Sequence, residues 1–552
     1  MRNKNLLLFL SLSYCLILSI SLQAQPDWVS ATMHANNVKV TVNSNGSLFW
    51  DFQEGQFIAP YDDNAPEIST MRASGLWLSG IDGAGHLRGA IQLYNEDQKT
   101  DFVPGILEGD IDQVQTREFN KIWRVTKTDI EAHRADYADN GVIDNPLPSI
   151  FGWPARKNAF FANYNDGIEL PTSDLGSLGP FWDLDANGNY NPDKGDYPLL
   201  IIRDCPVLDI EIPKEMLWFS FHDRTNHTQS GLLALNIEVQ CTVFAYECEA
   251  AENPINNSVF VDYKIINNGS TPLDSTYVGF FNDFDLGNPT DDFFGVDQSR
   301  HLVYAYNGDS VDEGFFEENI PTMGIDVLRG PLNEMGEEQG MGFVQPFDAD
   351  QTVVGAEFYR LLTGSKTDGT PADYNGVYYP DNPNDPNGTS EISLGNIPGD
   401  RATISSFGPF LYQPGAVNQV LVAYTFHQDA NNSVLENVDA FIDQSDQVQA
   451  FFDNCMTNTT CDFLLPTEEL FGAYTSIYPN PTMDELIIEV EVPILQSLRV
   501  IDLQGKVLQR YNWSTPIEQF NLSLGDLPTG LYILQWTTTE GKQYSKKIVR
   551  SF

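Results

Sequence analysis

Apolar and polar residues alternate over short stretches through most of this 552-residue chain. In residues 233–243 one set of alternate positions is apolar and the other is mostly polar, namely Leu233, Leu235, Ile237, Val239, Cys241 and Val243 against Asn236, Glu238, Gln240 and Thr242. A period of two places the two sets on opposite faces of a half-buried β-strand. Turns rich in Gly and Pro separate such stretches, which favours an all-β protein. We predict a β-sandwich-type body of one to three domains.

One segment near the end of this body has a helical period instead. Ser433 and Glu436 have the spacing of a capping box, and apolar residues follow at helical intervals. The predicted division of the chain is a signal peptide at 1–24, an N-terminal β-rich region with an acidic loop at 25–200, a central β-sandwich region with a closing helix at 201–455, a linker at 456–474 and a C-terminal domain at 475–552.

The first residues have the pattern of a secretory signal peptide. Arg2 and Lys4 precede an apolar run, and Ala24 offers a small residue for cleavage. Cys15 suggests lipid attachment, but the bulky Tyr14 before it does not fit that motif. No later stretch reaches the roughly 18 apolar residues of a spanning helix. We therefore expect export to the periplasm and no transmembrane segment in the mature protein.

Removal of the signal peptide leaves five cysteines. Cys455 and Cys461 flank a short polar loop, and we predict a disulfide between them. Cys241 and Cys248 can pair only if the chain turns between them, because an odd separation places them on opposite faces of a strand. Cys205 is then the expected unpaired thiol.

The charge of the chain is strongly negative and unevenly distributed. The formal net charge is −47. Residues Gln25 to Tyr474 hold 69 acids against 21 bases, whereas the segment from Thr475 onward holds eight acids against seven bases. Such an acidic body repels nucleic acid and anionic lipid. The last segment is therefore predicted to be a separate unit. We expect no nucleic-acid partner for the acidic body.

The C-terminal segment begins with a stiff turn and continues as short strands. The turn is Tyr478-Pro479-Asn480-Pro481, and further turns fall at Gln504-Gly505, around Gly530 and at Glu540-Gly541. About 75 residues of short antiparallel strands predict a small immunoglobulin-like sandwich.

This segment resembles the type A C-terminal sorting domain of the type IX secretion system of Bacteroidetes. The resemblance lies in the Tyr-Pro-Asn-Pro turn, the turn at 502–506, the block 527–534 and the closing block 545–550. The residues that it marks as the sorting signal are Pro479, Asn480, Pro481, Gly530, Tyr532, Lys546, Lys547 and Val549. The resemblance implies that the type IX machinery is a partner and that the protein reaches the outer cell surface or the medium by way of the periplasm.

The body resembles, more loosely, a group of uncharacterised proteins that carry the same kind of sorting domain. The shared blocks are residues 75–78, 152–155, the acidic loop with 195–198, the loop around Asp283, 306–309, 398–401 and 407–410. This resemblance implies little about mechanism.

One acidic loop has the oxygen spacing of a calcium site. Asp183, Asp185 and Asn187 stand at positions 1, 3 and 5, and Gly188 stands at position 6, as in a loop of the EF-hand type. Alternate side chains then converge on one cation while the glycine permits the sharp turn. The alternative is a solvated turn rich in Asp and Asn.

The later part of this loop departs from the EF-hand pattern. Asn189 would offer its backbone carbonyl, and Asn191 a side chain or a water. Lys194 occupies position 12, where an EF-hand has a bidentate Glu. We expect Asp193 or Asp196 to supply that contact, with Ca²⁺ as the cofactor.

A second acidic loop follows two apolar strands. It carries five carboxylates within fifteen residues, Asp283, Asp285, Asp291, Asp292 and Asp297. Unpaired like charges at this density are costly, and a hard divalent cation offsets them. Calcium and ordinary surface acidity are both compatible with this loop, because the whole body is acidic.

Motifs of common hydrolases are absent from the sequence. It has no HExxH zinc motif, no Gly-x-Ser-x-Gly elbow and no P-loop. His222, Asp223 and His227 form the one histidine cluster, which suits either a transition metal or a polar turn. Catalysis is therefore not the first expectation.

Three functions remain open. The first is a non-catalytic, calcium-stabilised structural or adhesive protein at the surface. The second is a carbohydrate-binding module for surface glycans, for which aromatic residues near loops can stack sugars, namely Trp77, Trp153, Trp182, Tyr378 and Tyr379. The third is a hydrolase acting on polysaccharide or protein, whose paired carboxylates cannot be picked out among so many acids.

Overall fold

The computed structural model describes most of the chain between residues 28 and 550. The described residues are 28–51, 53–95, 99–107, 118–171, 178–205, 210–251, 253–348, 351–456, 461, 475–478, 482, 484–490, 495–501, 507–517, 519–525, 527–528, 530–538 and 543–550. The predicted signal peptide and most of the predicted linker therefore lie outside the described residues. The chain divides into two compact units, the first made of Met1–Val207, Ile212–Glu247 and Asn256–Phe441, and the second of Leu208–Glu211, Cys248–Ile255 and Ile442–Phe552.

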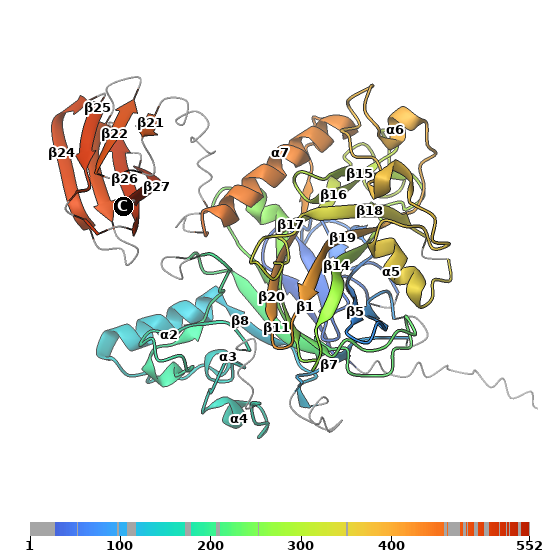
Figure 1. The fold of residues 1–552 in the computed structure, drawn as a ribbon, viewed down its shortest axis with the longest axis horizontal. Helices are drawn as coiled ribbons and strands as arrows, with labels where there is room; N and C mark the ends of the chain where they lie inside the picture. Colours follow the sequence, from blue (N-terminus) through green and yellow to red (C-terminus); the bar gives the residue numbers. More distant parts are fainter. Residues whose placement is uncertain are drawn as a thin grey trace, which may run out of the picture. The chain divides into compact units, whose positions relative to one another are not determined.

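Two antiparallel sheets form the frame of the first unit (Figure 1). The nine-stranded sheet contains β7 (Val103–Pro104), β8 (Trp123–Thr126), β11 (Glu215–His222), β12 (Ile237–Ala245), β13 (Ser258–Asn267), β15 (Asp292–Asp297), β16 (Leu302–Asn307), β17 (Thr322–Arg329) and β20 (Val417–His427). The five-stranded sheet contains β5 (Ala73–Asp82), β6 (Leu87–Ile91), β14 (Leu273–Phe284), β18 (Met341–Phe347) and β19 (Arg401–Tyr412).

Smaller elements complete this unit. A four-stranded sheet contains β1 (Ser30–His34), β2 (Lys39–Asn43), β3 (Phe57–Ile58) and β4 (Ser69–Met71), and a two-stranded one pairs β9 (Phe181–Trp182) with β10 (Tyr197–Pro198). The helices are α2 (Lys127–Asn140), α3 (Pro148–Phe151), α4 (Phe161–Tyr164), α5 (Ala356–Leu362) and α6 (Glu391–Leu394), with 3₁₀ turns η3 (Pro192–Lys194) and η5 (Asp373–Gly376). Helix α7 (Val434–Asp453) and the 3₁₀ turn η4 (Pro254–Asn257) each have residues in both units.

The main hydrophobic core lies between the two large sheets. Val239 and Val261 of the nine-stranded sheet belong to the same buried cluster as Leu76 and Phe280 of the five-stranded sheet. A second cluster, in which α5 takes part, holds Trp77 and Phe281 together with Phe358. Neighbouring residues in β5 and β14 thus serve different cores, as the two faces of a strand require. The predicted all-β, sandwich-type body is confirmed.

Strand β12 differs from the predicted half-buried strand. Its apolar face lies in the main core, but Glu238, Gln240 and Thr242 on the other face are also buried, at 3%, 1% and 2% exposure. Connecting segments cover this face: the backbone N–H of Leu107 donates to Glu238 at 2.6 Å. The alternation in the sequence therefore identifies the strand but not the burial of its polar face.

The stretch 117–130 alternates like a single strand, but its described part contains a short strand and the start of a helix instead. Strand β8 ends at Thr126, and α2 begins at Lys127. Thr126 and Asp129 make a reciprocal capping box across the first turn. This Thr-x-x-Asp spacing is a helix-start signal, and it explains why the strand stops.

The predicted helix at the end of the body is present as α7. The backbone N–H of Ser433 donates to the Glu436 carboxylate at 2.8 Å, and the Glu436 N–H donates back to Ser433 Oγ at 3.4 Å. The ring of Phe441 lies against Tyr304, with centroids 6.1 Å apart. The capping box and the apolar face of this helix are therefore confirmed.

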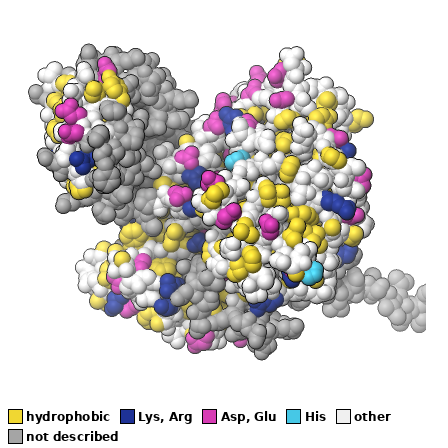
Figure 2. Space-filling view, in the orientation of Figure 1, with side chains coloured by type: hydrophobic (Ala, Val, Ile, Leu, Met, Phe, Trp, Pro, Cys, Tyr) yellow, Lys and Arg dark blue, Asp and Glu magenta, His cyan; other side chains and the backbone are white. Residues whose placement is uncertain are grey.

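On the face drawn in Figure 2, acidic side chains are scattered rather than gathered in one patch. A high density of acids in the sequence is therefore a poor guide to a site in this protein. The informative feature is the convergence of several carboxylates on one point in a partly desolvated setting.

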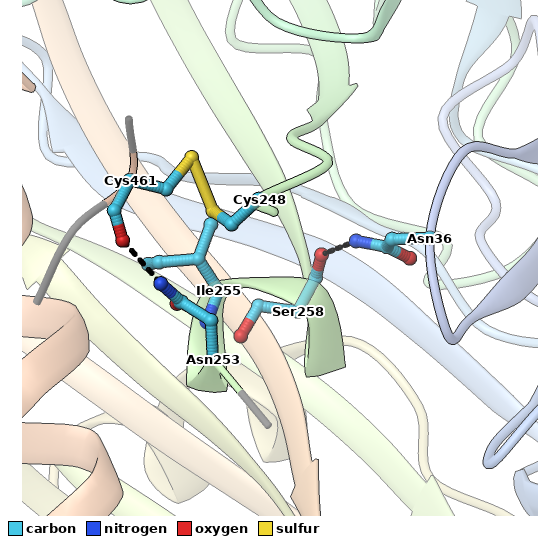
Figure 3. The surroundings of a disulfide bond; sticks show 6 residues. All are labelled: Asn36, Cys248, Asn253, Ile255, Ser258 and Cys461. Atoms are coloured by element: carbon cyan, nitrogen blue, oxygen red, sulfur yellow. Dashed lines mark hydrogen bonds between the residues drawn. A yellow bond between two sulfur atoms is a disulfide. The ribbon is translucent and has the colours of Figure 1, made fainter. Parts of the chain in front are cut away.

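The disulfide pattern corrects the prediction for the cysteines. Cys461 is bonded to Cys248, 213 residues away, and not to Cys455 (Figure 3). The Asn253 amide donates to the carbonyl of Cys461 beside this bond. Cys205 and Cys455 are also disulfide-bonded, whereas Cys241 is the free, buried thiol. Proximity in sequence misled here because a fold brings distant segments into bonding range.

The C-terminal domain is a small sandwich of two sheets. One sheet contains β21 (Thr475–Tyr478), β22 (Glu485–Val490) and β25 (Gln519–Ser523), and the other contains β23 (Leu495–Ile501), β24 (Val507–Ile517), β26 (Gly530–Thr538) and β27 (Gln543–Arg550). Leu486 and Ile488 of the first sheet share a buried core with Val500 and Leu534 of the second. The predicted small sandwich is confirmed.

Candidate metal centres and an adjoining cavity

The first acidic loop is closed by a hairpin whose strands are only two residues long. Strand β9 pairs with β10 so that Trp182 lies opposite Tyr197. Asp183 directly follows Trp182, and Asp196 directly precedes Tyr197, so the pairing brings these two carboxylates together. Carboxylate oxygens of Asp183, Asp185 and Asp196 lie within 4.8 Å of one another. We call this group the loop cluster.

Backbone N–H groups already surround the loop cluster. Asp183 accepts hydrogen bonds from the N–H of Gly188 at 2.6 Å and of Asn187 at 3.2 Å. Asp196 accepts from the N–H of Leu184 at 2.9 Å and of Asn191 at 2.7 Å. Gly188 has φ +76°, a conformation that Gly adopts without steric cost. The loop is thus preorganised around its carboxylates.

The structure distinguishes between the two predicted closing residues. Asp196 is buried and belongs to the loop cluster. Asp193 lies instead on η3 and faces Lys194, with 3.3 Å between Oδ2 and Nζ. Burial raises the pKa of Asp196 to about 6, against the opposing effect of its two backbone donors, and the charges of Asp183 and Asp185 raise it further.

Two asparagines of this loop are occupied by local hydrogen bonds. Asn187 Oδ1 accepts from the N–H of Asn189 at 2.7 Å, and the Asn189 carbonyl accepts from the Asn191 amide at 3.1 Å. A cation that used these oxygens would replace weak local bonds. Both oxygens remain candidate ligands.

The second acidic cluster lies where two strands of the five-stranded sheet leave the sheet. Strand β14 pairs with β19 so that Phe284 lies opposite Arg401. Asp285 and Asp400 are the next residues beyond this pair. Carboxylate oxygens of Asp283, Asp285 and Asp400 lie within 4.8 Å of one another. We call this group the cavity cluster.

Asp400 belongs to the cavity cluster, although the sequence pattern did not indicate it as a ligand. It lies in the Pro398-Gly399-Asp400-Arg401 block, about 115 residues beyond Asp285. The sequence of that block does not indicate that Asp400 meets Asp283, because only the pairing of β14 with β19 brings the two residues together.

Three of the five acids predicted for the second loop lie outside the cavity cluster. Asp292 is buried at the start of β15 and accepts from the N–H of Leu286 at 3.0 Å. Asp291 accepts from the Asn288 amide at 3.0 Å. Asp297, at the far end of β15, pairs with Arg300 at 2.6 Å. Each has a local structural partner instead.

A tyrosine hydroxyl donates to the cavity cluster, and an arginine lies close to it. Tyr94 donates its hydroxyl to Asp283 Oδ2 at 2.7 Å. Arg72 Nε lies 4.0 Å from the same oxygen, and its guanidinium lies over the rings of Trp50 and Tyr94, at 4.8 and 5.5 Å from their centroids. The buried Nε has no hydrogen-bond partner among the described residues.

Burial and mutual repulsion raise the pKa values of two carboxyls in the cavity cluster. Burial, with the charge of Asp285, raises the pKa of Asp283 to about 8 despite the Tyr94 hydrogen bond. Burial also raises the pKa of Asp285 to about 6, against the opposing charge of Arg72. Groups of this kind mark candidate functional sites when they line a cleft.

The cavity cluster opens into a cavity of about 820 Å³. Its charged lining comprises Arg72, Asp283, Asp348, Glu391, Asp400 and Arg401, and its aromatic lining comprises Tyr94, Phe294, Phe347 and Tyr379. Glu391 and Arg401 form a two-pronged pair with both distances at 2.9 Å. Concave sites of this size with a few convergent polar groups are typical of ligand pockets.

Most of the aromatic residues expected to stack sugars have other roles. Trp77 and Trp153 are fully buried in the fold, and Tyr378 is 9% exposed. Tyr379 is different, because it lines the cavity and has φ +51°, a strained value for a residue with a side chain. Trp182 is part of β9 beside the loop cluster.

The histidine cluster is a buried structural network. The two ring nitrogens of His227 lie 2.8 Å from the Gly89 carbonyl and 2.7 Å from the Asp223 carbonyl. Carbonyl oxygens only accept, so both nitrogens donate at once only when the ring is doubly protonated. Asp101 and Asp223 lie 3.8 Å from the ring and are fully buried. His222 is also buried, and burial, with the charge of Arg224, lowers its pKa to about 3.

In the C-terminal domain, the residues of the expected sorting signal are distributed over the last two strands. Gly530 starts β26, and the Tyr532 hydroxyl donates to the carbonyl of Pro528 at 2.5 Å. Lys546, Lys547 and Val549 lie on β27, opposite Leu534, Ile533 and Leu531 of β26. Pro479, Asn480 and Pro481 lie outside the described residues.

The fold thus combines a mostly β body, which carries two acidic clusters, with a separate small sandwich. Residues 476–551 match the family described as "Secretion system C-terminal sorting domain". The end of the chain is a sorting domain of the type IX secretion system, so the protein is secreted to the cell surface or outside and interacts with that machinery. Among the described residues, no helix is long and apolar enough to cross a membrane.

The comparisons give no comparable identification of the body. No curated protein matches the chain. One solved structure, titled as a polysaccharide lyase, is similar with 9% identity and a TM-score of 0.18, over 57% of this chain and 34% of that chain. The chain thus spans about a third of that protein's length, and a likeness at this score carries no argument about activity.

Proposed function

We propose that this type IX cargo is a non-catalytic structural or adhesive protein whose body is stabilised by Ca²⁺ in the loop cluster. The observation that carries the proposal is the convergence of Asp183, Asp185 and Asp196 within 4.8 Å, in a loop closed by the β9–β10 hairpin. Oxygen-only ligands on a short loop suit Ca²⁺. Asn187 and the Asn189 carbonyl are the further protein ligands.

Calcium binding is expected to contribute to folding stability directly. A ligand that binds only the folded state stabilises it by RT ln(1 + [L]/Kd), about 2.7 kcal/mol at a hundredfold excess over Kd. The strongly acidic body also gains from the lower self-repulsion. Extracellular sites of this class work at about millimolar calcium.

Thermal melts test the metal part of the proposal. We expect Ca²⁺ to raise the melting temperature of the wild-type chain relative to EGTA, and Asp185→Ala to remove most of that rise. Asp62→Ala is the matched control, because Asp62 is also an exposed acid that accepts a backbone N–H in a turn. No rise in any of the proteins would exclude a stabilising Ca²⁺ site. An equal rise in all of them would place the site elsewhere.

The positions of His222 and His227 support a non-catalytic role. His227 is held between two backbone carbonyls, and His222 is buried in β11, so neither is placed to act as a base in the cavity. The alternative is a hydrolase acting on polysaccharide or protein. Turnover on a panel of such substrates, lost on substitution of a cavity carboxylate, would establish it.

A second candidate function is carbohydrate binding in the cavity. The observation that favours it is the combination of four aromatic side chains with carboxylates, arginines and the amides of Gln351 and Asn396 around one cavity. Apolar faces of sugar rings pack on aromatic side chains while polar groups fix their orientation. Binding of the full chain to a panel of glycans tests this function.

A further inference from the structure

One buried histidine joins segments that belong to the two large sheets. His227 lies in the loop between β11 and β12 of the nine-stranded sheet, and its side chain is 1% exposed. One ring nitrogen lies 2.8 Å from the carbonyl of Gly89, in β6 of the five-stranded sheet. The other lies 2.7 Å from the carbonyl of Asp223, the residue directly after β11. The ring therefore spans from one sheet to the other, and we call this arrangement the histidine bridge.

Two buried carboxylates face the ring of the bridge. Asp101 Oδ2 lies 3.8 Å from Nδ1 of His227, and Asp223 Oδ2 lies 3.8 Å from Nε2. Both aspartate side chains are fully buried. Among the described residues, His227 is the one side chain able to carry a positive charge within 4.0 Å of either carboxylate. Buried charges need an opposite charge close by, so a protonated ring suits this position.

Other charged groups near the bridge act elsewhere. Arg88 of β6 lies 2.8 Å from Asp82. Arg224 acts on His222, where burial, with the charge of Arg224, lowers the pKa to about 3. The positive charge that the two carboxylates of the bridge meet at close range is thus that of His227.

The same carboxylates hold the backbone on both sides of the bridge. Asp101 accepts the N–H of Ile91 in β6 at 3.1 Å and the N–H of Gln229 in the loop at 3.0 Å. Asp223 accepts the N–H of Ile237 at the start of β12 at 2.7 Å. Burial raises the pKa of Asp223 to about 6, against the charge of His227 and its backbone donors. Loss of the charge on the ring would leave both carboxylates without a close cation.

A neutral ring cannot make both contacts of the bridge. Carbonyl oxygens only accept, and a neutral imidazole carries a single N–H. Its second nitrogen would then place a lone pair against a carbonyl oxygen less than 3 Å away. Both hydrogen bonds therefore require both ring protons. Histidine is the side chain whose ordinary pKa, about 6.5, allows this change between mild acid and mild alkali.

We propose that the histidine bridge is a pH-sensitive connection between the two large sheets. With both ring protons present, it holds the loop after β11 against β6, and the loss of one proton as the pH rises releases this contact. The carbonyl of Leu233 also accepts the N–H of Gly89, at 3.0 Å, and this bond does not depend on the ring. The release is therefore local and affects the loop before Leu233.

The test measures ring protons and backbone protection in the full chain at about pH 6 and about pH 9, on either side of the ordinary histidine pKa. ¹⁵N spectra of histidine-labelled protein count the protons on each ring, and the signal missing from His227→Gln identifies the ring of interest. Hydrogen exchange, corrected for the intrinsic rate at each pH, reports the protection of residues 226–231. His133→Gln is the matched control, because His133 is equally buried, in α2, and burial lowers its pKa.

We expect the His227 ring to carry two protons at about pH 6 and one at about pH 9. Protection of residues 226–231 should fall about tenfold or more between the two, the contribution of one hydrogen bond to a charged group. His227→Gln should show the lower protection already at the acid pH, and His133→Gln should follow the wild type.

A His227 ring with a single proton at the acid pH would overturn the inference. Equal protection of residues 226–231 in the wild type at both pH values would overturn it too, as would wild-type protection in His227→Gln at the acid pH. If His227→Gln does not fold, the comparison of the wild type at the two pH values decides alone.

Discussion

The loop cluster and the cavity cluster contain the same three side chains, three aspartates within one ion's reach, but their surroundings differ. In the loop cluster, backbone N–H groups donate to Asp183 and Asp196 at 2.6 to 3.2 Å. In the cavity cluster, one tyrosine hydroxyl donates to Asp283. The loop supplies its own donors because consecutive residues curl around the carboxylates. The cavity cluster is assembled by strand pairing, which uses the backbone donors for the sheet.

This difference explains why the two clusters suit different roles. A carboxylate that accepts backbone hydrogen bonds is stabilised in its charged form, so the loop cluster can exist without a ligand and gain rigidity from one. In the cavity cluster, by contrast, Asp283 and Asp400 line an open cavity. The first arrangement is typical of structural cation sites, and the second of sites that bind ligands.

The largest expected effect concerns Glu238, a buried carboxyl that belongs to neither cluster. Glu238 is 3% exposed, and burial raises its pKa to about 7, against hydrogen bonds from Gln240 and from the Leu107 N–H. The folded state then binds more protons than the unfolded state between pH 4.5 and 7, so stability falls as pH rises through that window and is flat above it.

Glu238→Gln should therefore reduce the loss of stability with rising pH, because glutamine stays neutral. Relative to the wild type, the variant should gain on the order of 3 kcal/mol between pH 4 and pH 8. Urea denaturation at several pH values in EGTA measures this. If the dependence of stability on pH were unchanged in Glu238→Gln, burial of this carboxyl would not be its cause. The contrast between the two clusters, which assumes that carboxylate burial is costly, would then be weaker.

The next effect concerns the donors in the loop cluster. Asp196→Ala leaves the N–H groups of Leu184 and Asn191 without their acceptor, and we expect a loss of about 2 kcal/mol even in EGTA. Asp400→Ala is the counterpart in the cavity cluster and should cause a smaller loss without metal, because its removal also relieves repulsion among the carboxylates. Denaturation measures both losses of stability. Equal losses would mean that backbone N–H donors matter no more in the loop cluster than in the cavity cluster.

A smaller effect is expected at the tyrosine that donates to the cavity cluster. Tyr94→Phe removes the hydroxyl that donates to Asp283 and should cost about 1 kcal/mol in EGTA. Tyr61→Phe is the matched control, because the Tyr61 hydroxyl donates to the exposed Asp63. Similar stability of both variants and the wild type would mean that solvent in the cavity replaces the Tyr94 hydroxyl.

The smallest effect distinguishes Asp193 from Asp196, the two residues that the sequence predicted as alternatives for the last ligand of the loop. Asp193 faces Lys194 on the surface, so Asp193→Ala should change stability by less than about 0.5 kcal/mol and leave calcium affinity unaltered. Asp196→Asn, which keeps the size of the side chain, should weaken calcium binding. Calorimetry on both variants decides this, and the opposite result would make Asp193 the ligand.

Much of the loop cluster was accessible to sequence reasoning because its chemistry is local. Asp183, Asp185, Asn187 and Gly188 occur within six residues, and their spacing encodes the turn. The choice of Asp196 required the two-residue hairpin that closes the loop. For the cavity cluster, the sequence indicated Asp283 and Asp285 but not Asp400. It also did not show that Asp291, Asp292 and Asp297 lie outside this cluster.

The sequence by itself determined the features that depend on local pattern. Alternation fixed the β class, the Ser433–Glu436 box fixed the start of α7, and the blocks after residue 475 fixed the sorting domain. Each of these is encoded within a few residues to a few tens of residues, where backbone geometry translates spacing directly into structure.

Only the tertiary structure decided which distant residues meet. It joined Cys248 to Cys461, buried the polar face of β12, and brought Asp400 beside Asp283 and Arg72. These contacts depend on the order and register of strands that are far apart in the chain, and a two-residue period carries no information on which strand lies beside which. The cavity exists for the same reason, since its walls come from segments more than 300 residues apart.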